Sequence, residues 1–180
     1  MDSLETARLL LRPLTHADTA FIIELLNEPS FIQNIGQRNV HTDEEARTYI
    51  TNAALNSYAK NGFGLAAVML KETNEIIGMC GLIRREALDD VDLGYAFLPR
   101  FWGKGYAVES AEAWLKFGWE VIGLTRIVAI VDPANEPSVR VLEKLGFVFE
   151  KIVRLSADDI ELKLFAASRL IAHQSGSDIA

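Results

Sequence analysis

Cysteine is nearly absent from this chain, and that absence limits how the protein can be stabilised. Its 180 residues contain one cysteine, Cys80, so an internal disulfide is excluded and a reducing compartment is expected. Long apolar runs are missing too, since none approaches the roughly 18 residues that a membrane-spanning helix needs. The N-terminal stretch has acids where a secretory signal has a basic region, and Arg8 and Arg12 interrupt its apolar run. We therefore expect a soluble cytoplasmic protein that does not bind a membrane.

Basic residues are in the minority. Lysine and arginine number 18 against 25 aspartates and glutamates, which gives a net charge of −7 and a pI near 5.0. This balance disfavours nonspecific binding to nucleic acid and is compatible with a cationic or amine-bearing substrate. The three histidines, His16, His41 and His173, are scattered singly along the sequence. They predict neither a metal site nor a catalytic triad.

The overall amino-acid composition is that of an ordinary globular protein. Apolar residues make up 49% and charged residues 24%, which argues against a largely disordered protein. The sequence shows no repeat and no interior linker, and its length suffices to bury one core. We expect a single domain over residues 1–168 and a polar, mobile tail over residues 169–180.

Helical periodicity and end signals predict four helices. The clearest lies between Thr42 and Gly62, because Thr42 and Glu45 have the spacing of a capping box and Gly62 stands where a helix stops. Its apolar positions follow the helical period. The expected helices span residues 15–26, 42–62, 105–122 and 135–146.

Extended apolar segments occupy most of the remaining sequence. Short polar loops join the three segments in the middle of the chain, which favours antiparallel neighbours. The run RIVAIVD is bounded by charges and indicates a strand buried on both faces. Because a long helix separates it from the strand before, the two form a βαβ unit and hence a parallel pair. We expect an α/β fold with a mixed, mostly antiparallel sheet of about seven strands and helices on both faces, the strands at 8–13, 63–70, 76–84, 91–98, 126–132, 147–155 and 160–166.

The stretch FLPRFWGKGYAVES joins a strand to the helix at 105–122 and places two glycines around a lysine. A helix begins with unpaired N–H groups and the positive end of its dipole, so it is suited to bind an anion. Gly103 and Gly105 can adopt positive φ and let an anion reach the amides, while Lys104 adds charge. We interpret the stretch as a site for a phosphate-bearing ligand. A plain glycine-rich turn remains the alternative.

Two motifs on either side of this helix resemble one known family. LGYAFLPRFWGKGYAVESA, followed by DPANEPSVRVLEKLGF, is similar to the core of the GNAT-type N-acetyltransferases. The opening TARLLLRPLTHAD resembles one branch of that family, the RimJ/RimL-like ribosomal-protein N-terminal acetyltransferases. The resemblance covers most of the chain. It implies a single-domain GNAT fold with one splayed parallel pair, and acetyl-CoA as the acyl donor without a metal.

The resemblance also implies how acetyl-CoA is held. The family loop Gln/Arg-x-x-Gly-x-Gly/Ala corresponds to residues 102–107 here, with Trp102 at the Gln/Arg position. Amides of residues 103–108 are expected to hold the pyrophosphate, and backbone groups of the preceding strand are expected to pair with the pantetheine arm. Asn135 has two expected roles, as helix N-cap and as partner of that arm. The implied cofactor-binding residues are Tyr95, Ala96, Phe97, Gly103, Lys104, Gly105, Tyr106, Ala107, Val108 and Asn135.

Acetyl transfer to an amine needs a base for the amine and a proton for the departing thiolate. Asp92, at the start of the strand with the cofactor contacts, is our candidate base, acting through water; a solvent-facing strand acid is the alternative. Many relatives carry a tyrosine acid at the position of Leu142, so that role is vacant here. Ser138 matches a serine proposed as the acid in the RimJ/RimL-like branch. Its alternative role is to help cap the helix and bind the cofactor.

The expected reaction is direct attack of a primary amine on the thioester. The branch resemblance makes a protein N-terminal α-amine the first choice of acceptor. A small-molecule amine acceptor, a CoA-binding regulatory module without catalysis and a binding domain that does not use CoA all stay open. The sequence does not determine the oligomeric state, and a homodimer is one alternative. The acids expected near the acceptor are Glu24, Glu28, Asp43, Glu44, Glu45, Glu86, Asp89 and Asp90.

Overall fold

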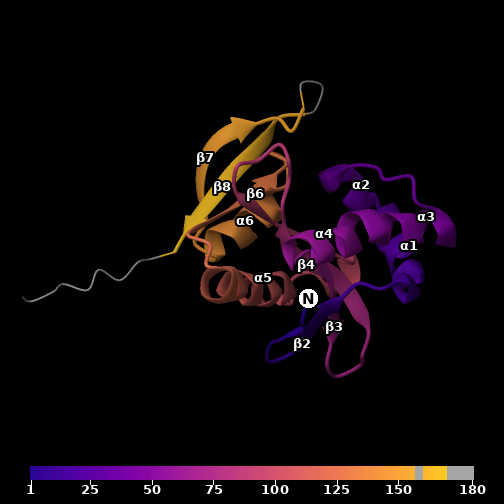
Figure 1. The fold of residues 1–180 in the computed structure, drawn as a ribbon. Coiled ribbons are helices and arrows are strands. Elements are labelled where there is room, and N and C mark those ends of the chain that lie inside the picture. The colour runs from indigo at the N-terminus through magenta and orange to yellow at the C-terminus, as the bar shows by residue number, and fades with distance from the viewer. Residues whose placement is uncertain (157–159, 170–180) are drawn as a thin grey trace, which may run out of the picture.

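In the computed structural model, the chain forms a single mixed sheet with helices on both faces (Figure 1). The structure describes residues 1–156 and 160–169. The predicted mobile tail and His173 lie outside the described residues, apart from the start of the tail at residue 169. Eight strands follow the order β1-β2-β3-β4-β5-β6-β8-β7. They are β1 (Leu4–Glu5), β2 (Leu9–Pro13), β3 (Leu65–Leu70), β4 (Ile76–Ile83), β5 (Val91–Phe97), β6 (Arg126–Val131), β7 (Val148–Val153) and β8 (Leu162–Ser168).

The predicted fold class is confirmed. Every neighbouring pair in the sheet is antiparallel except β5 and β6, which are parallel. The strand number is eight rather than about seven, because residues 4–5 form β1 against β2. A strand of two residues is too short to show a period of alternation, so the sequence pattern does not reveal it.

The helices match the predicted regions with two differences. The expected helices at 42–62 and 105–122 each contain a π-helical segment, Thr51–Leu55 and Gly118–Ile122 respectively. A further helix, α2, was not predicted, and its seven residues with proline at the start give little periodicity to detect. The helices are α1 (Thr19–Asn27), α2 (Pro29–Ile35), α3 (Asp43–Ile50), α4 (Asn56–Asn61), α5 (Tyr106–Phe117) and α6 (Glu136–Lys144).

The core forms where α5 packs on the middle of the sheet. Trp114 of α5 is 0% exposed and lies among buried strand residues, as expected for a core aromatic. Cys80 of β4 is also fully buried, and burial raises the pKa of its thiol to about 12. The thiol therefore stays protonated and unreactive near neutral pH.

The parallel pair opens soon after it begins. β5 and β6 pair only at Val91 with Ile127 and at Asp92 with Val128, although β5 continues to Phe97 and β6 continues to Val131. Beyond Asp92, β6 keeps its pairing with β8 and leaves β5. The expected splayed pair is thus present, and it creates an opening in the middle of the sheet.

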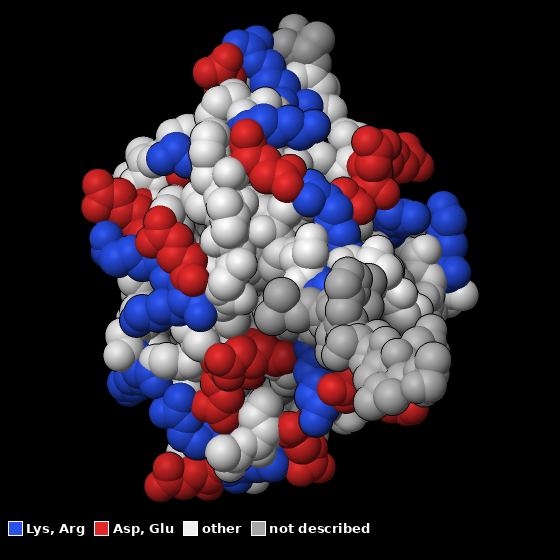
Figure 2. Space-filling model, turned by 90° about the vertical axis from the view of Figure 1, so that its left-hand side faces the viewer, with Lys and Arg blue, Asp and Glu red and all other residues white. Residues whose placement is uncertain are grey.

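The surface gives no sign of a polyanion site on the face that Figure 2 shows. Acidic and basic side chains mix there around an uncharged strip, without a continuous basic patch on its described part (Figure 2). This mixture agrees with the acidic balance of the whole sequence. Among the described residues, no helix combines the length and the apolar character needed to cross a membrane.

Candidate functional site

Two glycines shape the loop that leads into α5. Gly103 has a φ of +74° and Gly105 has a φ of +82°, both in the left-handed region that favours glycine. Gly105 is the N-cap of α5 and provides no side-chain cap. None of the amides of residues 103–108 donates a hydrogen bond to any part of the chain that the structure describes. The start of α5 therefore presents a run of free N–H groups at the positive end of the helix dipole.

Arg8, just before β2, holds one side of this loop. Its Nη1 donates to the carbonyl of Lys104 at 3.1 Å, and its guanidinium lies 4.5 Å from the ring centroid of Tyr106. Its Nε and Nη2 bind the Glu109 carboxylate at 2.7 and 2.6 Å. These contacts fix the loop from the far end of the sequence and place a cation beside the free amides.

The alternation along β5 decides which backbone groups face the opening. The amide of Leu98 donates to the carbonyl of Ile77, and β5 keeps an unbroken register with β4. Every second residue of β5 therefore turns its amide and carbonyl toward β4, and Ala96 is one of them. Tyr95 and Phe97 turn their backbone groups the other way, toward the opening.

Trp102 modifies this pattern at the end of β5. Its indole Nε1 donates to the carbonyl of Phe97 at 2.7 Å and so ties the glycine loop to the strand. The amide and carbonyl of Tyr95 and the amide of Phe97 remain on the open side. An extended ligand that carries amide groups can pair with them as an added strand.

Asp92 stands at the last position where β5 and β6 pair. It is 1% exposed, its Oδ2 accepts from Arg85 Nε at 2.6 Å, and its Oδ1 has no hydrogen-bond partner among the described residues. Burial raises the pKa of Asp92, and the charge and hydrogen bond of Arg85, together with the nearby Ile130 backbone amide, offset part of that rise. The alternative of a solvent-facing strand acid is thus wrong. A buried carboxylate with one unpaired oxygen and a raised pKa is suited to accept a proton.

Ser138 lies in the first turn of α6, where its side chain meets Tyr95. The Tyr95 hydroxyl is 2.7 Å from Ser138 Oγ and 3.2 Å from the Ser138 carbonyl oxygen. The N-cap of α6 is Asn135, whose Oδ1 accepts from the Ser138 amide at 3.2 Å. The hydroxyl of Ser138 is therefore not a cap, and it is available for another role.

Asp92 and Ser138 approach the opening from opposite faces of the sheet. Asp92 and Tyr95 are three positions apart on β5, so their side chains point to opposite faces, and Ser138 contacts Tyr95. This arrangement suits a reaction in which a nucleophile loses a proton on one side of a reacting centre and a leaving group gains one on the other.

Three of the acids expected near the acceptor are already engaged. Asp90 pairs with Arg126 at 2.8 Å, and Glu24 pairs with Arg100 at 2.6 Å. Glu45 completes the predicted capping box of α3, since its carboxylate accepts from backbone amides at the start of that helix. These three acids therefore contribute less to the recognition of a cation than their charges indicate.

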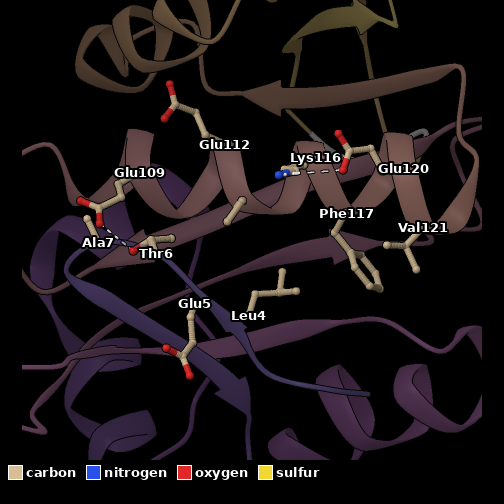
Figure 3. A pocket seen from close by; sticks show the side chains of 11 residues that line it. Leu4, Glu5, Thr6, Ala7, Glu109, Glu112, Lys116, Phe117, Glu120 and Val121 are labelled. Atoms are coloured by element: carbon tan, nitrogen blue, oxygen red, sulfur yellow. Dashed lines mark hydrogen bonds and ion pairs between the residues drawn. The ribbon is translucent and has the colours of Figure 1, made fainter.

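A groove of about 500 Å³ lies along α5, and Glu109 is the one residue described above that lines it (Figure 3). Residues 4–7 form one wall and α5 forms the other, and Thr6 Oγ1 donates to Glu109 at 2.6 Å across it. None of the predicted catalytic or cofactor residues lines this groove. It is therefore not the place where the predicted chemistry would occur.

Sequence reasoning missed three residues that shape the site. Arg85 was not among the predicted site residues, although the hairpin register opposes Ile83 and Asp92 and so brings Arg85 near that acid. Trp102 was placed only at the Gln/Arg position of the family loop, without a contact of its own. Arg8 gave no local signal, because its partners in the glycine loop and in α5 are distant in sequence.

Comparisons with known proteins agree with this geometry. The family model described as "Acetyltransferase (GNAT) domain" matches residues 8–148. YoaA of Bacillus subtilis, an uncharacterized N-acetyltransferase, is 31% identical over 152 residues, which cover 84% of this chain and 85% of YoaA. An acetyltransferase structure from Agrobacterium tumefaciens has a TM-score of 0.80 at 26% identity and covers 94% of this chain and 95% of its own.

A structure with lower identity has the same fold. RimL, a ribosomal L7/L12 alpha-N-protein acetyltransferase in complex with coenzyme A, has a TM-score of 0.79 at 18% identity, covering 92% of this chain and 97% of RimL. The family model spans most of the sequence, including the glycine loop and the splayed strands. The protein therefore belongs to the GNAT family of acetyltransferases and is an acyltransferase.

Proposed function

We propose that this enzyme transfers the acetyl group of acetyl-CoA to a protein N-terminal α-amine by direct attack of the amine on the thioester. One observation carries the proposal: the free amides of residues 103–108 stand at the end of the strand whose backbone borders the opening. A ligand with phosphates at one end and an amide-bearing arm at the other fits both features together. Acetyl-CoA has that construction.

The chain supplies separate groups for the two ends of this ligand. The amides of residues 103–108, with Lys104 nearby, bind the pyrophosphate. The backbone of Tyr95 pairs with the pantetheine arm, and the Phe97 amide is left for the thioester end of the ligand. Because Asn135 uses its Oδ1 as a cap, only its Nδ2 is left to donate to the arm. The backbone groups of Ala96 pair with β4, so only its methyl group can contact the pantetheine arm.

Asp92 is the general base in this proposal. A protein N-terminal α-amine has a pKa of about 8, so most of it is protonated at neutral pH; once neutral, its nitrogen must still give up a proton as it attacks. The raised pKa of Asp92 makes its carboxylate a stronger proton acceptor than an exposed aspartate. We assign the proton to Oδ1, the unpaired oxygen, and expect a water molecule to carry it there from the amine.

Ser138 and Phe97 act on the thioester side. The Phe97 amide faces the opening and donates to the oxyanion that forms when the amine attacks. Ser138 Oγ donates its proton to the sulfur as the carbon–sulfur bond breaks. Leu142 is buried and apolar, so it cannot supply the proton that a tyrosine supplies at that position in many relatives.

The acceptor class rests on similarity and has a second candidate. RimL, whose fold is similar, is by its name an acetyltransferase of a protein α-amine. The spermidine N(1)-acetyltransferase of Escherichia coli, by its name specific for a polyamine, is 24% identical over 154 residues, 78% of this chain and 73% of its own length. Asp43 and Glu44 stand exposed in the first turn of α3 and favour this second candidate, since they could attract a polycation.

Thiol release from acetyl-CoA tests the proposal. The panel contains peptides with a free N-terminus, the same peptides with an acetylated N-terminus, spermidine, free amino acids and an aminoglycoside. Release with the free peptides alone is the expected result, and release with spermidine alone favours the second candidate. Calorimetric binding of CoA without release on any amine indicates a regulatory module. A protein that neither binds CoA nor releases thiol contradicts the proposal.

A further inference from the structure

The hydroxyl of Tyr95 has no role in the reaction as described so far, yet it makes the closest contact of Ser138. Its distance of 2.7 Å from Ser138 Oγ is that of a good hydrogen bond between hydroxyl groups. Tyr95 lies on β5 beside the opening, and Ser138 comes from α6. The contact therefore joins the two elements that flank the expected thioester position.

The two hydroxyl protons can be arranged in two ways. In one, Ser138 Oγ donates to Tyr95, and Tyr95 donates to the Ser138 carbonyl oxygen 3.2 Å away. Both protons are then used within the pair. In the other, Tyr95 donates to Ser138 Oγ, and the Ser138 proton is free to point into the opening. Only the second arrangement allows Ser138 to donate to a sulfur atom.

We propose, on the basis of the function proposed above, that Tyr95 is a positioning residue: its phenol donates to Ser138 Oγ and turns the Ser138 proton toward the departing thiol. Serine alone has a hydroxyl that rotates freely, and a fixed donor on its oxygen restricts that rotation. The same donor stabilises the negative charge that builds on Oγ as its proton leaves.

The phenol itself keeps its proton throughout. Burial raises the pKa of Tyr95, and the hydrogen bond with Ser138 lowers it only in part. A neutral phenol is therefore present over the whole working range of pH and remains a donor.

The step balances without any added reactant. The ammonium form of the amine first loses one proton to solvent. The neutral nitrogen then forms the carbon–nitrogen bond, and its second proton passes through water to Asp92. The carbon–sulfur bond breaks, the sulfur keeps the electron pair and the Ser138 proton neutralises it. Solvent then returns a proton from Asp92 to Ser138, and Tyr95 is unchanged.

A double-mutant cycle on kcat tests this inference, with Tyr95→Phe, Ser138→Ala and the double variant assayed at saturating acetyl-CoA and acceptor. We expect Tyr95→Phe to lower kcat about ten-fold and Ser138→Ala to lower it about a hundred-fold, in the range for general acid catalysis. KM for acetyl-CoA should change little in either. Because Tyr95 acts through Ser138, the double variant should be no slower than Ser138→Ala alone.

Tyr58→Phe is the matched control. It also removes a half-buried tyrosine hydroxyl, one that binds the Leu14 amide and the Leu65 carbonyl away from the opening. It should lower the melting temperature without lowering kcat. Losses that multiply in the double variant, or a Tyr95→Phe variant with wild-type kcat, overturn the role of Tyr95 while the proposed function stands. A wild-type protein that releases no thiol with any amine overturns both.

Discussion

Burial and ion pairing act on the Asp92 carboxyl in opposite directions. Burial raises its pKa, and Arg85, bound to one oxygen at 2.6 Å, lowers it. The net direction is upward from the ordinary value of 3.8. A base needs this compromise, because a carboxyl with too high a pKa is protonated at working pH and one with too low a pKa accepts protons poorly.

The pH dependence of kcat/KM checks this balance. Since the base must be ionised, we expect activity to rise with pH through an apparent pKa above 3.8. Arg85→Gln removes the opposing charge, so this limb should move to higher pH, and Asp92→Asn should abolish it. Arg84→Gln is the control, because Arg84 binds only the Asp89 carbonyl in the described structure and should leave the limb in place. A limb that persists in Asp92→Asn below the pH range in which the acceptor amine itself titrates contradicts the assignment of the base.

The sequence identifies Asp92 and Ser138 as candidates but not what holds them. Asp92 is a candidate because it starts the strand with the expected cofactor contacts, and Ser138 is a candidate because of the resemblance to the RimJ/RimL-like branch. Arg85 and the Tyr95 hydroxyl matter because of side-chain directions, and one sequence without coordinates does not supply these. The contact of Arg8 with the glycine loop cannot be predicted from the sequence either, since only the folded sheet brings the two together.

Elements with strong local signals were predicted well. The capping box at Thr42 and Glu45 forms as expected, and Asn135 caps α6. The π-helical segments were not predicted, because each covers only five residues within a longer helix, too few to show a period of their own. β7 is also weakly marked, since it lies at the sheet edge with most of its side chains exposed.

The glycine loop makes a prediction at the scale of one element. Gly105→Ala places a side chain at a φ of +82°, which costs about 1–2 kcal/mol of stability or shifts the loop. If a displaced amide loses a bond to a charged phosphate, worth about 1.5–3 kcal/mol, KM for acetyl-CoA should rise roughly ten-fold or more. Titration calorimetry with CoA and a thermal melt measure both effects.

Gly62→Ala is the matched control for this loop. Gly62 has a φ of +77° at the end of α4, and an added Cβ there meets nothing within 4 Å. It should lower the melting temperature to a similar extent and leave CoA binding unchanged. Equal CoA affinities in the two variants contradict the assignment of residues 103–108 to the pyrophosphate.

At the scale of the whole molecule, the decisive feature is the divergence of β5 from β6. It frees backbone groups in the middle of the sheet, where a compact domain otherwise pairs them. It also lets Asp92 and Ser138 reach one opening from opposite faces. The sequence predicts that β5 and β6 are parallel, because the pattern of the helix that connects them is easy to recognise. The opening between them is expected only from the family resemblance, since no local pattern marks where two strands separate.

The central claim is that these two residues perform acyl transfer at this opening. The most direct test is kcat for thiol release from saturating acetyl-CoA, with the best acceptor of the panel, for the wild type, Asp92→Asn and Ser138→Ala. CoA titration first establishes that all three proteins still bind the cosubstrate. We predict losses of about a hundred-fold in each variant with CoA binding retained. Variants that bind CoA and keep kcat within about two-fold of the wild type, well below the range for acid–base catalysis, would contradict the account.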